Sequence, residues 1–176
     1  MKLATAIGLI SIFILGLAGC ETPDAGGGRK VVASGKEDVD LNAVPAEVIA
    51  LVRASQPELN VSEAEYETRD GNEYYDVGGT MPDGSELELD ITRIDGVWTV
   101  VETQRDIEMA STPDAVAQAL QSKVAGWSPD RIIESDQGDG AVIYEFFGKD
   151  GAGEDTKIEV KYEGGQAEVL VDEWLH

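Results

Sequence analysis

Carboxylates are the residues of this sequence that are numerous enough to do chemistry. The 176 residues include 35 Asp and Glu against 13 Lys and Arg, a formal net charge of −22 with the one His neutral. Binding to nucleic-acid phosphates requires clustered cations, so this balance excludes a nucleic-acid partner. Glycoside hydrolysis needs two carboxyl groups, one of them desolvated. Most acids here fall on alternating strands or in turns, so we expect no enzyme; a carboxylate-based hydrolase of envelope polymers is kept as an alternative.

Nucleophilic catalysis has little support in the sequence. A nucleophile must lie beside a base, and the single Cys and single His are Cys20 and His176. His176 stands at the end of the sequence, where a side chain is expected to be solvated. One Cys excludes an internal disulfide and a metal site with several Cys ligands. We therefore predict no catalytic or cofactor-binding residue and no metal site.

Two loops rich in acids and glycine raise the question of calcium. Residues 136–140 read Asp-Gln-Gly-Asp-Gly, and residues 150–155 read Asp-Gly-Ala-Gly-Glu-Asp. An EF-hand needs Glu at its twelfth loop position, and counting from Asp136 that position holds Phe147. Asp-Gly between strands is first a hairpin signal. We predict turns here, and a calcium- or cation-binding structural envelope lipoprotein remains an alternative function.

A row of acids is predicted to share one face of a strand. Glu86, Glu88 and Asp90 alternate with aliphatic residues, so burying the aliphatic residues turns the three acids to the opposite face. One interpretation is a solvated face that keeps the protein soluble. The other is a negative docking surface that steers a basic protein or peptide partner. The candidate partner-binding residues are Asp76, Glu86, Glu88, Asp90, Tyr74 and Trp98.

The beginning of the sequence has the plan of an export signal. Residues 1–19 carry Lys2 and then a long apolar run that ends in Leu-Ala-Gly before Cys20. Leu-Ala-Gly-Cys resembles the lipobox of bacterial lipoproteins, which implies cleavage before Cys20 and acylation of its thiol. Two or three acyl chains would anchor the protein stably in a membrane. Glu21 resembles the common sorting pattern for the outer membrane, so we expect an outer-membrane lipoprotein that faces the periplasm, if the host has an outer membrane. Residues 20–43, with their glycines and mixed charges, are predicted to be a flexible tether.

The order of predicted elements repeats along the rest of the chain. Residues 44–110 and 111–176 each begin with a helical pattern, followed by a strand that contains Tyr, a Gly turn and an alternating strand. In the second unit Thr112 suits the N-cap and Pro113 the first helical position. An alternating strand with one polar face is typical of an antiparallel sheet that a helix covers on one side. The sequence therefore predicts an α+β fold of two tandem repeats, each with one helix packed on one face of an antiparallel meander of three or four strands.

These motifs resemble those of the PepSY-like, beta-lactamase-inhibitor-like domain family. The resemblance lies in Val-Pro-x-x-Val at 44–48, the following Tyr strand, the acidic alternating strand and Asp-Gly-Val-Trp at 95–98. The second unit departs from the pattern, since residues 165–167 read Gly-Gln-Ala. The resemblance implies a tandem helix-on-sheet fold, export and a binding role without catalysis. We thus expect a lipid-anchored envelope binding or modulator protein.

Overall fold

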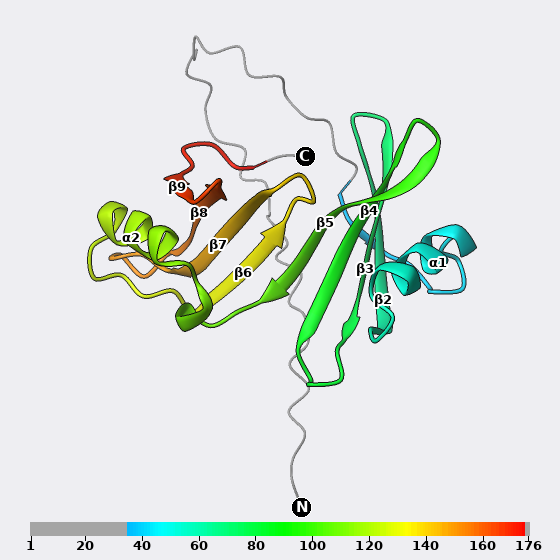
Figure 1. Cartoon of the computed structure of the whole chain (residues 1–176), viewed down its shortest axis with the longest axis horizontal. Coiled ribbons are helices and arrows are strands. Elements are labelled where there is room, and N and C mark those ends of the chain that lie inside the picture. The colour runs from blue at the N-terminus through cyan, green and yellow to red at the C-terminus, as the bar shows by residue number, and fades with distance from the viewer. Residues whose placement is uncertain (1–34, 175–176) are drawn as a thin grey trace, which may run out of the picture. The chain divides into compact units, whose positions relative to one another are not determined.

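Nine antiparallel strands form one sheet in which each strand pairs with its neighbours in the sequence (Figure 1). The structure is a computed structural model and describes residues 35–174. The strands are β1 (Glu37–Asp38), β2 (Asn60–Arg69), β3 (Asn72–Thr80), β4 (Glu86–Ile94), β5 (Val97–Asp106), β6 (Arg131–Asp136), β7 (Ala141–Lys149), β8 (Asp155–Glu163) and β9 (Gln166–Val169). The Asp-Gly pairs of residues 35–174 and Gly164-Gly165 lie in the turns between strands, as the patterning predicts, whereas Gly78-Gly79 lies within β3.

The continuity of this sheet corrects the predicted architecture. We expected two tandem units, 44–110 and 111–176, each with its own helix and meander. Instead β5 pairs with β6, from Thr103 opposite Asp136 to Asp106 opposite Ile133. An unpaired edge leaves backbone N–H and C=O groups without partners, and this pairing satisfies them. The prediction of two tandem repeats is therefore wrong, and the chain builds one sheet.

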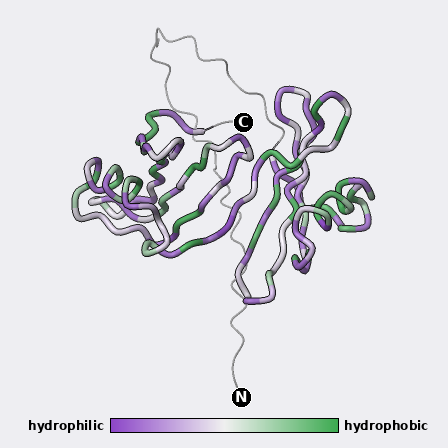
Figure 2. The backbone as a smooth tube through the Cα atoms, in the orientation of Figure 1, coloured by the Kyte–Doolittle hydropathy of each residue, from purple (hydrophilic) through white to green (hydrophobic). Residues whose placement is uncertain are grey.

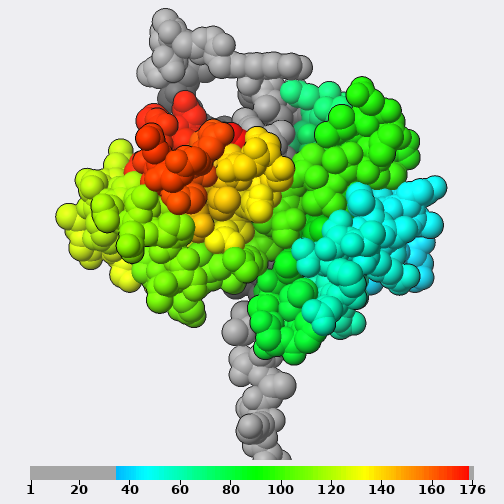
Figure 3. All heavy atoms as spheres, in the orientation of Figure 1, coloured from blue at the N-terminus to red at the C-terminus, as the bar shows by residue number. Residues whose placement is uncertain are grey.

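Two short amphipathic helices pack on the sheet. They are α1 (Ala46–Ser55) and α2 (Asp114–Lys123). Val48 and Val52 of α1 are completely buried, and residues four apart share one face of a helix. In Figure 2 both helices change between hydrophobic and hydrophilic along their length, as helices with one buried face do. Figure 3 shows α1, in cyan, over the green strands of the first half of the sheet.

Thr112 does not act as the predicted N-cap of α2. Pro113 takes the N-cap position, and no side chain caps the helix. The Thr112 hydroxyl is buried without a hydrogen-bond partner among the described residues. A 3₁₀ helix, η1 (Met109–Ser111), leads into this turn, and the Thr112 N–H donates to the carbonyl of Met109. The backbone N–H of Thr112 thus closes the last turn of η1. The acidic residue in the first turn of α2 is Asp114, whose carboxylate interacts favourably with the helix dipole.

Both helices cover the same face of the sheet. Leu89 on β4 belongs to the apolar cluster of α1, and Tyr144 on β7 belongs to that of α2. The register from β4 to β7 puts the side chains of these two residues on one face, because paired residues point the same way. The opposite face carries a row that runs from Glu88 through Gln104 and Ser135 on neighbouring strands. We call this the polar face of the sheet.

One strand lies within the segment that the sequence analysis assigns to the tether. β1 pairs with β2, with Glu37 opposite Tyr66 and Asp38 opposite Glu65. The Val39 N–H then donates to the carbonyl of Ala64 at 2.9 Å. The predicted signal peptide and Cys20 lie outside the described residues. Within residues 35–174, neither helix is long and apolar enough to cross a bilayer.

Candidate functional site

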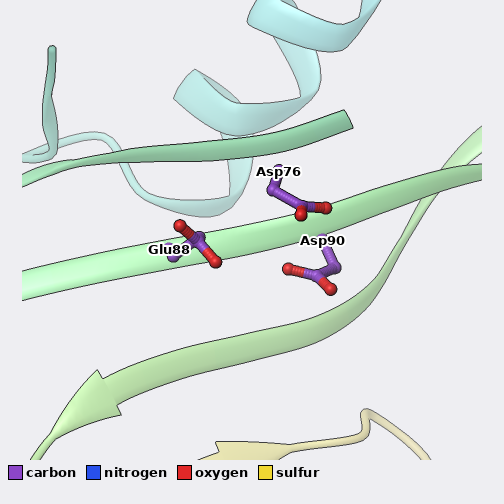
Figure 4. Close-up of side chains that lie close together, drawn as sticks. All are labelled: Asp76, Glu88 and Asp90. Atoms are coloured by element: carbon purple, nitrogen blue, oxygen red, sulfur yellow. The ribbon is translucent and has the colours of Figure 1, made fainter. Parts of the chain in front are cut away.

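Three carboxylates gather on the polar face of the sheet. Asp76 lies on β3 and pairs with Asp90 on β4, and Glu88 lies two residues before Asp90. One carboxylate oxygen from each residue lies within 4.8 Å of the others, and Figure 4 shows the three groups converging. Asp76 and Asp90 are each only 1% exposed, and Glu88 is half-buried. We call Asp76, Glu88 and Asp90 the carboxylate cluster.

The strand alternation explains why these acids meet. Leu89 and Ile91 are completely buried beneath α1, which forces Glu88 and Asp90 to the other face of β4. Val77 is buried in the same apolar cluster, so Asp76 is turned away from the helix. The alternation along the strand correctly predicts that Glu88 and Asp90 lie on the face away from the helix. The interpretation of a solvated face is wrong for Asp76 and Asp90, because both are buried.

A lysine from the N-terminal side of the fold lies on the carboxylate cluster. Lys36 directly precedes β1, and its Nζ lies 2.5 Å from Asp76 Oδ2 and 3.6 Å from Glu65 Oε2. Burial lowers the pKa of Lys36, but the charge of Asp76 and its hydrogen bond outweigh burial and hold that pKa above its usual value. The lysine is therefore charged and supplies the cluster with one cation. Its side chain remains 41% exposed.

The positive charge of Lys36 does not fully offset the negative charge of the carboxylate cluster. Burial, followed by the charge of Asp90, raises the pKa of Asp76 to about 7 despite the opposite effect of Lys36. Burial, followed by the charges of Asp90 and Asp76, raises the pKa of Glu88 to about 8. Desolvation disfavours the charged form of a carboxyl group, and neighbouring like charges add to that cost. The cluster therefore retains protons near neutral pH and is a place where a further cation would be stabilised.

An arginine approaches the cluster from β2. Arg69 pairs with Glu67, and its Nη2 lies 3.8 Å from Asp90 Oδ2. Its guanidinium carbon also lies 4.4 Å from the centre of the Tyr74 ring, within the range of a cation–π contact. Tyr74 is 7% exposed. This predicted contact residue is therefore close to the site but is covered by the protein's own arginine.

Two predicted partner-binding residues lie away from the carboxylate cluster. Glu86 begins β4 opposite Thr80, and its charge raises the pKa of Glu63 after the effect of burial. Trp98 lies on the helix-covered face, where it packs against the apolar cluster of α1. Its ring lies 5.5 Å from that of Tyr75, and the guanidinium of Arg93 is 4.4 Å above it. The structure thus brings Asp76, Glu88, Asp90 and Tyr74 together. Glu86 lies on the same face outside the carboxylate cluster, and Trp98 lies on the opposite face.

The negative charge of a second carboxylate pair on the polar face is neutralised by a lysine in a different position. Glu145 on β7 lies opposite Glu159 on β8. Lys157, which lies on β8 itself, places its Nζ 3.2 Å from Glu145 and 2.7 Å from Glu159. The same ammonium lies 2.7 Å from Glu173 in the C-terminal segment. Here the cation is part of the nine-residue strand β8, whereas Lys36 directly precedes the two-residue edge strand β1.

The two acidic glycine loops form turns, as their Asp-Gly pairs predict. In the first loop Asp136 Oδ1 accepts the Gly138 N–H at 2.9 Å. In the second, Asp150 Oδ1 accepts the N–H groups of Ala152 and Glu154 at 2.8 and 2.9 Å. These backbone hydrogen bonds hold the pKa of Asp150 below its ordinary value. Asp136 and Asp150 therefore accept hydrogen bonds from the backbone of their own turns.

Among the described residues, the carboxylate cluster is the place with suitable spacing for a metal ion. Three carboxylates are the oxygen ligands that hard cations prefer. The ammonium of Lys36 lies against Asp76 in that place. The ammonium of Lys36 therefore occupies the Asp76 side of the cluster.

Lys36 and Arg69 are site residues that were not among the predicted ones, and Lys36 lies closest to the carboxylates. Lys36 falls in a segment with glycines and mixed charges, which is typical of a tether. The signal that could have found it is the alternation of Val39 and Leu41 with acids after it, because period-2 patterning indicates a strand. Both aliphatic residues pack against the apolar cluster of α1.

The sequence matches no model of a known protein family and, among curated proteins, has no significant match. A solved structure of a DUF2874-family protein from Bacteroides vulgatus ATCC 8482, described as periplasmic, is similar at 20% sequence identity. The match covers 78% of this chain and 95% of that chain, with a TM-score of 0.30. At this identity and TM-score, the similarity supports no inference about this chain.

Proposed function

We propose that this chain is a lipid-anchored protein of the cell envelope that binds a basic protein or peptide and has no catalytic role. The observation that carries the proposal is the carboxylate cluster of Asp76, Glu88 and Asp90, on which the ammonium of Lys36 lies. Two of these acids have a raised pKa in spite of that lysine. A lysine or arginine of a partner would find charge complementarity there, which favours association and specificity.

The burial of the cluster favours binding over hydrolysis of a polymer. A carboxyl group with a raised pKa is suited to general acid catalysis, so the cluster has one property of a hydrolase site. Two carboxyl groups must also flank the bond that is cleaved. Asp76 and Asp90 are each 1% exposed, and Lys36 lies on Asp76. A flexible side chain can reach such a place, whereas a sugar ring needs an open cleft.

The envelope location is supported by the sequence. The apolar run that ends in Leu-Ala-Gly-Cys supports export and lipid attachment at Cys20. Glu21 supports an outer membrane as the destination where the host has one. The motifs of residues 44–108 support the PepSY-like resemblance, which is part of this proposal along with its implied binding role.

Replacement of Cys20 by Ser tests the lipid anchor. The thioether that carries the acyl chains requires the Cys thiol, so Cys20→Ser should release the protein from the membrane fraction or leave its signal uncleaved. The measurement is detergent partitioning and the mass of the chain after fractionation of the envelope. Ser122→Ala, which keeps Cys20, is the control and should stay in the membrane fraction. Unchanged partitioning of Cys20→Ser would refute lipid anchoring.

Neutralisation of the cluster tests the binding role. The double variant Asp76→Asn, Glu88→Gln should bind a labelled peptide of alternating Lys and Val residues about tenfold more weakly than the unaltered protein. A control that replaces two exposed acids by their amides, Glu154→Gln with Asp172→Asn, should change the affinity less than twofold. Equal affinities of the two double variants would show that only net charge matters and would contradict the proposal.

A further inference from the structure

The way in which Lys36 reaches the cluster defines a binding geometry. β1 pairs with β2 over only two residues, and Lys36 precedes it on the face shared by Asp38 and Glu65. From this position its ammonium reaches Asp76, which lies one strand further into the sheet. An extended segment beside β2 can therefore deliver a cation to the carboxylate cluster. β-strand addition to a sheet edge is a common mode of peptide recognition.

The cluster retains hydrogen-bonding capacity after Lys36 has bound. The ammonium lies against Oδ2 of Asp76. The other oxygen, Oδ1, is buried and has no hydrogen-bond partner within residues 35–174. Buried acceptors without a partner are rare and costly in proteins. Asp76 therefore presents an unsatisfied acceptor inside the cluster, and its raised pKa agrees with that geometry.

Lys36 is held more loosely than the corresponding lysine of the other carboxylate pair. The Lys157 ammonium lies within 3.2 Å of three carboxylates, and its backbone is in the nine-residue strand β8, where it pairs with Phe147 of β7. Lys36 precedes a two-residue strand at the margin of the sheet, and its side chain is 41% exposed. A strand as short as β1 can detach from β2 at a small cost in free energy, because few backbone hydrogen bonds are lost.

We infer that β1 and Lys36 are an intramolecular occupant of a peptide site, and that an extended basic peptide displaces them. The peptide would pair with β2 in the place of β1, and its lysine or arginine would enter the carboxylate cluster in the place of Lys36. A guanidinium group has five N–H donors in a planar fork, so an arginine could satisfy both oxygens of Asp76. This inference rests on the proposed function, since it names how a basic partner binds.

Removal of the intramolecular lysine tests the inference. The experiment uses the full-length protein in detergent and the labelled peptide of alternating Lys and Val residues, with fluorescence anisotropy as the measurement. A competitor that occupies a site lowers the apparent affinity of a ligand by the fraction of sites left open. Lys36→Gln should therefore bind the peptide about three- to tenfold more tightly. Lys149→Gln removes the same charge from an exposed lysine that pairs with Asp155, and it should raise the affinity less than twofold.

A second measurement needs no substitution. In the unaltered protein the Val39 N–H is protected by the carbonyl of Ala64. Peptide binding should accelerate hydrogen exchange at Val39 if β1 leaves, while the amides of β3 and β4 should exchange no faster. Unchanged exchange at Val39 on saturation with peptide would overturn the inference.

The remaining outcomes separate this inference from the proposed function. If Asp76→Asn with Glu88→Gln weakens binding and Lys36→Gln leaves it unchanged, the cluster binds the partner but Lys36 is no competitor, and the inference fails alone. If the unaltered protein and Lys36→Gln both fail to bind the peptide, the proposed function fails as well. If millimolar calcium raises the melting temperature of Lys36→Gln and blocks the peptide, the occupant of the cluster is a metal ion, and the inference is overturned.

Discussion

A buried carboxylate such as Asp76 makes the stability of the fold depend on pH in an unusual direction. Its ordinary pKa is 3.8 and burial with the charge of Asp90 raises it to about 7, while the pKa of Glu88 rises from 4.5 to about 8. At a pH between the ordinary and the raised pKa of each group, the folded state holds a proton that the unfolded chain has lost. The free energy of unfolding therefore falls as pH rises. The stabilisation is complete below about pH 4 and is lost as pH passes through 7 to 8.

We therefore expect the free energy of unfolding to fall between pH 5 and pH 8, by on the order of 1.4 kcal/mol for each pH unit over which one of these groups is protonated only in the folded state. The double variant Asp76→Asn, Glu88→Gln should show a smaller fall, because its amides do not ionise. Urea denaturation at several pH values measures both. Asp172→Asn, which changes an exposed acid, should keep the pH dependence of the unaltered protein. A rise in stability from pH 5 to pH 8 would contradict the assignment of the buried acids.

At the residue scale, the sequence predicts which face each acid occupies but not what covers it. The alternation of Glu88 and Asp90 with Leu89 follows directly from the period of a strand. Burial of Asp76 and Asp90 depends on neighbours from distant parts of the sequence, such as Lys36 and Arg69. No local pattern encodes such contacts. The predicted solvated face fails for this reason.

At the scale of elements, one glycine controls the pairing of two strands. Gly79 on β3 lies opposite Val61 at an irregularity of β2. A Cβ at Gly79 would lie 2.2 Å from the carbonyl oxygen of Asn60 and 2.9 Å from the Cα of Val61. These are backbone atoms, so the strands must move apart to accept the methyl group. We expect Gly79→Ala to destabilise the fold by about 2–3 kcal/mol, measured by urea denaturation.

The neighbouring glycine provides a matched control. A Cβ at Gly78 would meet the side chain of Glu63, with Oε1 at 3.0 Å. That side chain is flexible and can turn away, so Gly78→Ala should cost less than about 1 kcal/mol. Equal losses for the two variants would show that the close approach of β2 to Gly79 is not what matters.

The elements themselves are largely predictable, and their assembly is not. The helical spacing of Val48 with Val52 and of Val116 with Leu120 predicts both helices, because each pair forms a buried face. Alternation and turn residues predict antiparallel strands after each helix. β1 itself has only two residues, and the alternation of Val39 and Leu41 with acids that could have indicated it begins just after it. The pairing of β5 with β6 escapes prediction because the whole of α2 separates these strands, and no local signal states which edges join.

At the scale of the molecule, a polar network ties the two parts of the sheet together. The Ser135 hydroxyl on β6 donates to Glu102 on β5, and Gln137 Nε2 donates to the same Glu102 oxygen at 3.0 Å. Trp174 Nε1 donates to Gln137 Oε1 at 2.8 Å. Glu102 is 5% exposed, and breaking a buried network of this kind is costly. Unfolding of β6 would therefore remove hydrogen-bond donors from the buried Glu102 and destabilise β5.

The continuous sheet leads us to expect that the fold unfolds as one cooperative unit, although its apolar residues form two separate clusters. Leu120 on α2 is completely buried in the second cluster, and Leu120→Ala should cost about 2–5 kcal/mol. Because β5 pairs with β6 and Glu102 depends on Ser135, this loss should also lower the protection of β3 and β4 in the first part of the sheet. Native-state hydrogen exchange measures the protection of each strand, with Gln118→Ala, an exposed residue of the same helix, as the control. A loss of protection confined to β6–β9 would show that the two parts unfold independently, whereas an equal loss in β3, β4, β7 and β8 is the result that one sheet requires.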